Sequence, residues 1–226
     1  MSKVKAILFD LFGTLTYQEN PVTNEEVSKH LCANGYDVSP QQFKAAFAFV
    51  AFVDYTRHGY RNWQSFLSRV FQRLRVNVHN KTLGDIVRLY ESRPLKLYPD
   101  AIDALVEAKG AGFKTATVTT GASFIVKTAV KPIGQHLDFL ITSYETGYDK
   151  SNPKMYQKAL EILKVKPQEA VMIGDDPQLD VLIPKSLGMK TTLIDREEKN
   201  KSQSVDASVY NLNEAMETII RQHGKN

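Results

Sequence analysis

Acidic side chains follow two apolar runs of this sequence, at points where buried strands would end. Asp10 comes directly after the run VKAILF. The run AVMI leads into GDDPQLD, which contributes Asp175, Asp176 and Asp180. A carboxylate that stays ionised beside cations can attack an electrophile and form a covalent intermediate. Asp10 is therefore a candidate nucleophile.

Two further strand-like runs end beside side chains that suit an anionic substrate. The run KTATVT ends on Thr119, with Thr120 next, and Lys150 lies in GYDKSNP after the run DFLIT. In a parallel α/β sheet the carboxyl ends of the strands lie side by side, and binding sites form beyond them. We therefore expect Thr119, Thr120 and Lys150 to lie close to Asp10.

The predicted sheet edge carries an excess of carboxylates. Neighbouring carboxylates repel one another, which raises their pKa values unless cations lie among them. Lys150 is one such cation. Because the other ligands on offer are all oxygen, a hard divalent ion is the natural second cation, and Mg²⁺ commonly takes one or two carboxylates together with waters and a substrate phosphate. The sequence therefore favours a Mg²⁺ site.

Short apolar runs alternate with helical patterns through most of the chain. Strands are expected at 4–9, 114–119, 138–142, 170–173, 190–194 and 207–210, and helices at 100–111, 123–130, 153–164, 178–187 and 212–222. The runs are apolar on both faces, as buried parallel strands are. The alternation predicts an α/β fold with an open parallel sheet.

The stretch 17–93 differs from the rest because it contains no convincing strand. Its pattern predicts four helices, at 23–34, 40–54, 62–75 and 81–91. We therefore expect two domains, an α/β core of 1–16 with 94–226 and an inserted helical domain of 17–93. Aromatic side chains are expected to form the core of the insert, with some of them as candidates for lining the substrate entrance: Phe43, Phe47, Phe49, Phe52 and Trp63.

Composition argues against several classes of protein. The 226 residues are 42% hydrophobic and carry a formal net charge of +4, with Lys and Arg spread along the chain, so nucleic-acid binding gains little support. No apolar run reaches about 18 residues, so no membrane span is expected. A single cysteine and no signal-peptide pattern predict a cytoplasmic protein. Both a monomer and a homodimer fit the sequence.

Taken together, the four segments resemble the four motifs of the haloacid dehalogenase superfamily, in the family's order. DLFGTLT is similar to the first motif, VTTG to the second, GYDKSNP to the third and GDDPQLD to the fourth. The insert 17–93 lies where the family's type 1 cap is inserted, so the resemblance covers the whole chain. It implies a Rossmann-like open parallel sheet with helices on both faces and an inserted all-helical cap domain.

The resemblance also implies roles for these residues. Asp10 would be the nucleophile, and in Mg²⁺-using members the metal is held by positions that correspond here to Asp10, the backbone carbonyl of Phe12, and Asp175. Asp176 and Asp180 would act nearby, through water at the metal or by orienting the lysine. Thr119, Thr120 and Lys150 would bind the anionic group of the substrate, and Arg57 in the insert is a further candidate for substrate binding.

Phe12 departs from the phosphatase pattern of the family. Phosphatases usually carry a second acid two residues after the nucleophile, and such general acid–base help is typically worth about 10²–10⁴-fold in rate. Dehalogenases have a non-acid there because halide leaves unprotonated. Tyr156, six residues after Lys150, also resembles a tyrosine of the dehalogenase site.

The fourth motif, GDDPQLD, instead favours a phosphatase over a dehalogenase. The dehalogenase version is rich in Ser and Asn and binds no metal, whereas GDDPQLD is acidic and would repel the carboxylate of a haloacid. We therefore favour Mg²⁺-dependent hydrolysis of a small phosphate ester or acyl phosphate. A metal-independent 2-haloacid dehalogenase and a catalytically weak binding or scaffold protein are the alternatives. The expected partner is a small anionic substrate, either a phosphorylated metabolite or a haloacid.

Two of the candidate residues also have a structural interpretation. Asp176 precedes Pro177, and Asp followed by Pro is typical of the start of a helix. Tyr156 has helical spacing with Ala159 and Leu160, which suits core packing.

Overall fold

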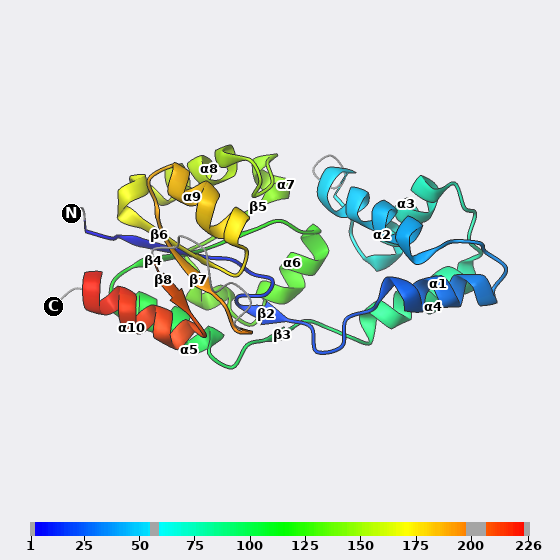
Figure 1. Ribbon diagram of the computed structural model, residues 1–226, viewed down its shortest axis with the longest axis horizontal. Helices are drawn as coiled ribbons and strands as arrows, with labels where there is room; N and C mark the ends of the chain where they lie inside the picture. Colours follow the sequence, from blue (N-terminus) through cyan, green and yellow to red (C-terminus); the bar gives the residue numbers. More distant parts are fainter. Residues whose placement is uncertain (1–2, 55–58, 198–206, 224–226) are drawn as a thin grey trace. The chain divides into compact units, whose positions relative to one another are not determined.

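The computed structural model describes residues 3–54, 59–197 and 207–223 (Figure 1). Its internal contacts divide the chain into an α/β unit of Met1–Tyr17, Leu97–Thr120 and Ala129–Asn226 and a helical unit of Gln18–Lys96 and Gly121–Thr128. Residues 121–128 therefore group with the helices, whereas the sequence analysis had placed them in the core domain. No helix in the described ranges is both long and apolar enough to cross a lipid bilayer.

One six-stranded parallel sheet forms the centre of the α/β unit. The strand order is β5-β4-β1-β6-β7-β8. The strands are β1 (Ala6–Phe9), β4 (Lys114–Thr119), β5 (Phe139–Thr142), β6 (Ala170–Gly174), β7 (Lys190–Ile194) and β8 (Ala207–Val209). Phe9 at the end of β1 pairs in register with Thr117 of β4 and Ile173 of β6. Asp10, the residue after Phe9, therefore lies near the middle of the edge that the carboxyl ends of the strands form.

Helices cover both faces of this sheet (Figure 1). α8 (Pro153–Leu163) and α9 (Ile183–Ser186) lie on one face, and α5 (Ala101–Gly110) and α10 (Leu212–His223) lie on the other. Every residue of β1 and β6 is buried, which explains why their sequences are apolar on both faces. The predicted α/β class, with a parallel sheet and an inserted helical region, is confirmed.

Most predicted elements of the α/β unit lie within two residues of their expected bounds, but short elements escaped prediction. These are β2 (Thr16–Tyr17) and β3 (Lys96–Leu97), which pair as a separate sheet, α7 (Ser143–Thr146), and the 3₁₀ turns η2 (Gly134–His136) and η3 (Pro167–Glu169). The helix expected at 178–187 is a π-helical turn, η4 (Pro177–Leu182), followed by α9. α6 (Ser123–Val130) matches its predicted range.

The helical unit has the four helices that its sequence predicts. They are α1 (Asn24–Ala33), α2 (Pro40–Phe49), which continues as the π-helical turn η1 (Val50–Asp54), α3 (Trp63–Leu74) and α4 (Asn80–Glu91). Side chains of Thr23, Ser39 and Asn62 cap the first, second and third of them.

Aromatic side chains fill the centre of the helical unit. Phe43 and Phe66 are fully buried in a hydrophobic cluster, and Phe47, Phe49 and Trp63 pack against this cluster. Phe52 is 53% exposed, so it is not part of this core, and the other prediction, a place at the substrate entrance, stays open. It lies in η1, where the change from α-helical to π-helical spacing alters the direction of the side chains.

Candidate active site

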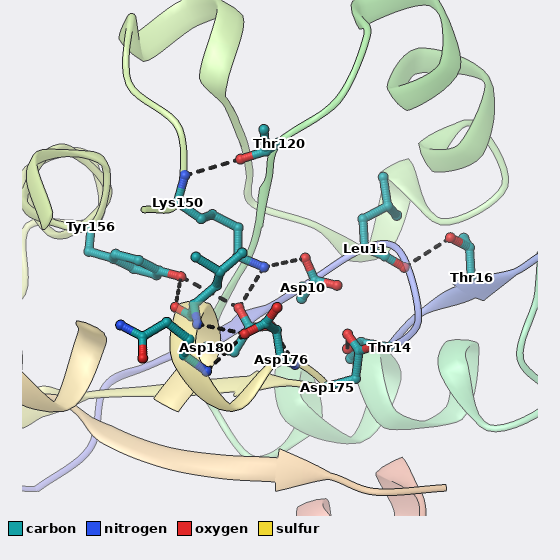
Figure 2. A network of polar contacts seen from close by, with 12 residues as sticks. Asp10, Leu11, Thr14, Thr16, Thr120, Lys150, Tyr156, Asp175, Asp176 and Asp180 are labelled. Atoms are coloured by element: carbon teal, nitrogen blue, oxygen red, sulfur yellow. Dashed lines mark hydrogen bonds and ion pairs between the residues drawn. The ribbon is translucent and has the colours of Figure 1, made fainter. Parts of the chain in front are cut away.

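Asp10 begins a tight loop at the carboxyl end of β1. Its amide donates to the carbonyl of Ile173 on β6 at 2.8 Å, which continues the sheet pairing by one step. The chain then turns back on itself, because the carbonyl of Leu11 accepts bonds from the amide of Leu15 at 3.1 Å and from the amide and hydroxyl of Thr16 at 2.8 and 2.9 Å (Figure 2). Asp10 therefore stands on a rigid turn at the centre of the edge.

Lys150 is buried between two carboxylates. Its Nζ lies 2.6 Å from Oδ1 of Asp10 and 2.5 Å from Oδ1 of Asp180 (Figure 2). The three side chains are 5%, 6% and 0% exposed. Burial by itself would lower the pKa of Lys150, but the charges of Asp10 and Asp180 outweigh it and raise that pKa overall. Lys150 therefore stays an ammonium ion at neutral pH and serves as a fixed positive charge.

Two glycines allow the acidic residues of the fourth motif to approach. Gly13 has φ +91°, in the left-handed region, and a Cβ there would overlap the carboxylate of Asp175. A Cβ on Gly174 would likewise overlap the side chain of Asp180. The absence of a side chain at both positions is thus a condition for the close packing of the site.

The turn η4 organises the fourth motif. Oδ1 of Asp176 accepts bonds from the amides of Gln178 and Leu179, both at 2.8 Å, so Asp176 caps the turn. Oδ2 of Asp180 accepts from the amide of Asp176 at 3.2 Å, and its Oδ1 accepts from Lys150. Both oxygens of Asp180 are therefore used inside the protein.

Tyr156 of α8 contacts the same turn. Its side chain is fully buried, and its hydroxyl donates to the carbonyl of Leu179 at 2.5 Å and lies 3.5 Å from Oδ1 of Asp180 (Figure 2). Burial and the charge of Asp180 raise the pKa of Tyr156, which keeps the hydroxyl protonated as a donor. These contacts fit the interpretation of Tyr156 as a residue that packs in the core.

Three carboxylates converge beside the lysine. Asp10, Asp175 and Asp180 each offer one oxygen, and these oxygens all lie within 4.8 Å of one another. Burial raises the pKa of Asp175 to about 6, and the charge of Asp10 adds to this rise while Lys150 opposes it. An all-oxygen donor set that is crowded with negative charge fits a divalent cation such as Mg²⁺. Asp176, a predicted metal ligand, is not part of this group.

The predicted anion-binding residues have different surroundings. Thr119 ends β4 fully buried, and its Oγ1 has no hydrogen-bond partner among the described residues. The hydroxyl of Thr120 accepts from the amide of Lys150 at 3.1 Å, which joins the second motif to the third. Arg57 lies outside the described residues. The hydroxyl of Thr119 is thus free to donate, and its role in binding an anion stays a prediction.

Some residues that shape the site escaped the sequence analysis. Thr14 faces the acid cluster, with its Oγ1 3.4 Å from Oδ1 of Asp175. Gly174 and the carbonyl of Leu179 have the roles described above. The GT pair of DLFGT was the only signal for Thr14, and nothing in the sequence indicated that Gly174 makes room for Asp180.

Comparison with known proteins places these four motifs in one family. The family model described as haloacid dehalogenase-like hydrolase matches residues 4–188. The chain belongs to this family. It is 28% identical over 197 residues to a protein named putative pyrophosphatase PpaX from Caldanaerobacter subterraneus, covering 85% of this chain and 82% of that protein.

Solved structures of phosphatases and dehalogenases share the fold of this hydrolase. A structure described as a HAD phosphatase from Thermococcus onnurineus is 25% identical, with a TM-score of 0.68 over 96% of this chain and 98% of that one. An L-2-haloacid dehalogenase from Xanthobacter autotrophicus, with chloropropionic acid covalently bound, has a TM-score of 0.63 over the same shares at 18% identity. The second likeness concerns the fold alone.

The raised pKa of Asp175 predicts that ionised Asp175 lowers the unfolding free energy of the metal-free protein, to a degree that depends on pH. Above pH 6 this carboxylate is ionised in the folded protein, where burial disfavours the charge, so it lowers the unfolding free energy. As the pH falls through 6, the folded state binds a proton that the unfolded state does not yet bind, and this loss of stability is relieved. Asp175→Asn should therefore be more stable than wild type at pH 7.5 in a chelator, and this advantage should shrink toward pH 5. Urea unfolding at both pH values measures it.

Asp103→Asn, an exposed change on α5, is the control for this measurement and should show no such trend. A difference between Asp175→Asn and wild type that stays constant from pH 5 to 7.5 would contradict the assigned pKa.

The contacts of Tyr156 predict a stability defect for Tyr156→Phe. Removing the hydroxyl leaves the carbonyl of Leu179 without this donor in a buried place, which should cost about 1–3 kcal/mol of unfolding free energy. Urea denaturation measures the loss, and Tyr210→Phe, at a side chain 54% exposed, should stay within about 0.5 kcal/mol of wild type. Unchanged stability with an altered KM would instead assign Tyr156 to substrate binding.

Proposed function

We propose that this hydrolase cleaves a small phosphate ester or acyl phosphate in a Mg²⁺-dependent reaction, with Asp10 as the nucleophile. The observation that carries the proposal is the convergence of Asp10, Asp175 and Asp180 on one ammonium, since three carboxylates exceed what Lys150 can neutralise. A divalent cation and a phosphate group together complete such a site.

Asp10, Asp175 and the carbonyl of Phe12 would hold the Mg²⁺ ion. Asp180 is assigned instead to orienting Lys150, because both of its oxygens already accept hydrogen bonds. Asp176 is assigned to capping η4. When bound, the metal supplies positive charge that offsets the negative charge of the carboxylates and of the phosphoryl group.

The reaction proceeds in two displacements. An oxygen of Asp10 attacks phosphorus, and the bond from phosphorus to the leaving oxygen breaks, which gives an aspartyl phosphate. Water then attacks the same phosphorus, the bond to Asp10 breaks, and inorganic phosphate departs with the carboxylate restored and a proton released to solvent. Lys150, whose Nζ lies 2.6 Å from Oδ1 of Asp10, supplies positive charge beside the nucleophile in both displacements.

The phosphoryl oxygens need donors close to Asp10. The unsatisfied hydroxyl of Thr119 supplies one, and Lys150 supplies positive charge beside it. Thr120 contributes by fixing the backbone of Lys150. Arg57 in the helical insert remains a candidate for binding the rest of a small anionic substrate.

Phe12 sets a limit on the leaving group. Its side chain has no proton to give, so the leaving oxygen must take one from solvent. The carboxylate of an acyl phosphate and the alkoxide of an acidic alcohol leave readily without a proton. We therefore expect acyl phosphates and phosphate esters of acidic alcohols to react fastest.

A haloacid dehalogenase activity is the alternative that Phe12 favours. Two features of the site weigh against it. The hydroxyl of Tyr156, the proposed dehalogenase residue, is already bonded to Leu179, and the acid cluster would repel a haloacid carboxylate in the absence of a metal. A weakly active binding or scaffold protein is the third candidate.

Phosphate release tests the proposal. Wild-type protein with Mg²⁺ should release phosphate from acetyl phosphate or p-nitrophenyl phosphate, and Asp10→Asn should lose at least about 10³-fold in kcat because the nucleophile is gone. Removing the metal with a chelator should abolish the activity, and added Mg²⁺ should restore it.

Competing outcomes separate the three functions. Halide released from 2-chloropropionate in the presence of a chelator would establish the dehalogenase instead. No turnover above the level of Asp10→Asn across a broad panel of esters and haloacids would leave the scaffold function. Glu107→Gln, an exposed change on α5, is the control and should have wild-type activity.

The role of Phe12 predicts a substrate-dependent gain. Phe12→Asp supplies a carboxylic acid two residues after the nucleophile, which should raise kcat more on an alkyl phosphate than on p-nitrophenyl phosphate. A shift of about tenfold or more in this ratio is expected, since general acid help is typically worth about 10²–10⁴-fold. Phe12→Asn, which adds polarity without an acidic proton, is the matched control. An unchanged ratio would contradict the proposed limit on the leaving group.

A further inference from the structure

Arg196 lies two residues after β7 and reaches the loop that follows β1. Its Nη1 and Nη2 donate to the two carboxylate oxygens of Asp100 at 3.0 and 2.9 Å, and Nη2 also donates to the carbonyl of Thr14 at 3.1 Å. The guanidinium lies 3.7 Å from the centre of the Tyr98 ring. Three partners, the Asp100 carboxylate, the Thr14 carbonyl and the Tyr98 ring, thus hold one side chain that none of the family motifs contains.

The carboxylate that holds Arg196 is itself anchored. Asp100 is 8% exposed and immediately precedes α5, and its Oδ2 accepts a further bond from the amide of Leu212 at the start of α10. A bidentate pair between Arg and a carboxylate has a fixed planar geometry. The position of the Arg196 guanidinium is therefore set by the ends of two core helices.

The loop after β1 receives this support at two adjacent carbonyls. Arg196 binds the carbonyl of Thr14, and the amide of Tyr98 donates to the carbonyl of Leu15 at 3.0 Å. On the other side of the same loop, Thr14 Oγ1 and the backbone of Gly13 lie against the carboxylate of Asp175. The loop is thus held between an arginine and an acidic residue of the candidate metal site.

We propose that Arg196 is a positioning residue for the metal-binding end of the site, acting through the Thr14 carbonyl on the loop that carries Asp10, Phe12 and Gly13. Residues that orient metal ligands typically change metal affinity or activity about 10–100-fold when removed. The metal part of this inference rests on the proposed function, whereas the effect on the loop does not.

Charge and geometry predict opposite effects of removing Arg196. Loss of a cation near a metal site should strengthen metal binding by simple electrostatics, because less positive charge remains to repel the ion. Loss of the hydrogen bond from Arg196 to the Thr14 carbonyl should weaken metal binding, because the loop no longer holds the metal ligands in place. Weaker metal binding would therefore indicate that Arg196 positions the loop, and tighter metal binding would indicate that its charge repels the ion.

Binding of Mn²⁺, followed by the electron paramagnetic resonance signal of the free ion, tests the proposal without turnover. Arg196→Met should weaken Mn²⁺ binding about tenfold, and Arg196→Lys should weaken it to a similar degree, since lysine keeps the charge but loses the fork. Arg93→Met is the matched control. Arg93 makes the same kind of bidentate pair with Glu26, at 2.6 and 2.7 Å, within the helical unit, and this variant should bind as wild type does.

Hydrogen exchange of the loop amides gives a second readout. The amides of Gly13, Leu15 and Thr16 are bonded within the loop, and both Arg196 variants should exchange them at least about tenfold faster than wild type while the amides of β6 keep their protection. The Lys variant serves if the Met variant does not fold.

Mn²⁺ affinity equal to or tighter than wild type in both Arg196 variants would overturn the proposal, as would unchanged exchange in the loop. If wild-type protein binds no Mn²⁺, the metal-dependent function fails, and the exchange data alone decide whether Arg196 positions the loop.

Discussion

The site depends on one buried ammonium ion. The side chain of Lys150 is only 5% exposed, and its charge is compensated because Asp10 and Asp180 both face it. Removing one partner of such a buried pair typically costs about 3–5 kcal/mol, because the remaining charge stays desolvated. The three residues come from segments that are far apart in the sequence, and their mutual need for charge compensation joins the loops after β1, β5 and β6 at one point.

The parallel sheet makes this meeting possible, and local details complete it. Pairing of β1 between β4 and β6 brings Asp10 to the centre of the edge, while Gly174 leaves space for Asp180. Asp176 and Tyr156 then fix the turn that carries Asp180. Because the carboxylates outnumber the ammonium, the finished cluster keeps a surplus of negative charge. Burial raises the pKa of Asp175, and the charge of Asp10 adds to this rise. The surplus of negative charge suits a cation.

Sequence reasoning located the parts of this site that follow from residue type and position at a strand end. Asp10, Lys150 and Asp180 are in contact, as the predicted sheet edge required. The support of the site was not predictable, because it depends on tertiary contacts that have no local signature. Arg196 belongs to an unremarkable charged segment, DREE, and β2 spans only two residues, too few for a periodic pattern. Phe52 was misplaced because a change in helical spacing leaves no mark in composition.

The hydrogen bonds of the site also separate the three acidic residues of the fourth motif by role. Both oxygens of Asp180 and one oxygen of Asp176 are bonded to protein donors at 3.2 Å or less, so these residues have little left to offer an ion. The side-chain contact to Asp175 is the long one from the hydroxyl of Thr14, at 3.4 Å, and burial raises the pKa of Asp175. A carboxylate that is half-buried, weakly bonded and raised in pKa is poorly stabilised by the protein alone. The proposed cation would supply the positive charge that the surroundings of Asp175 lack.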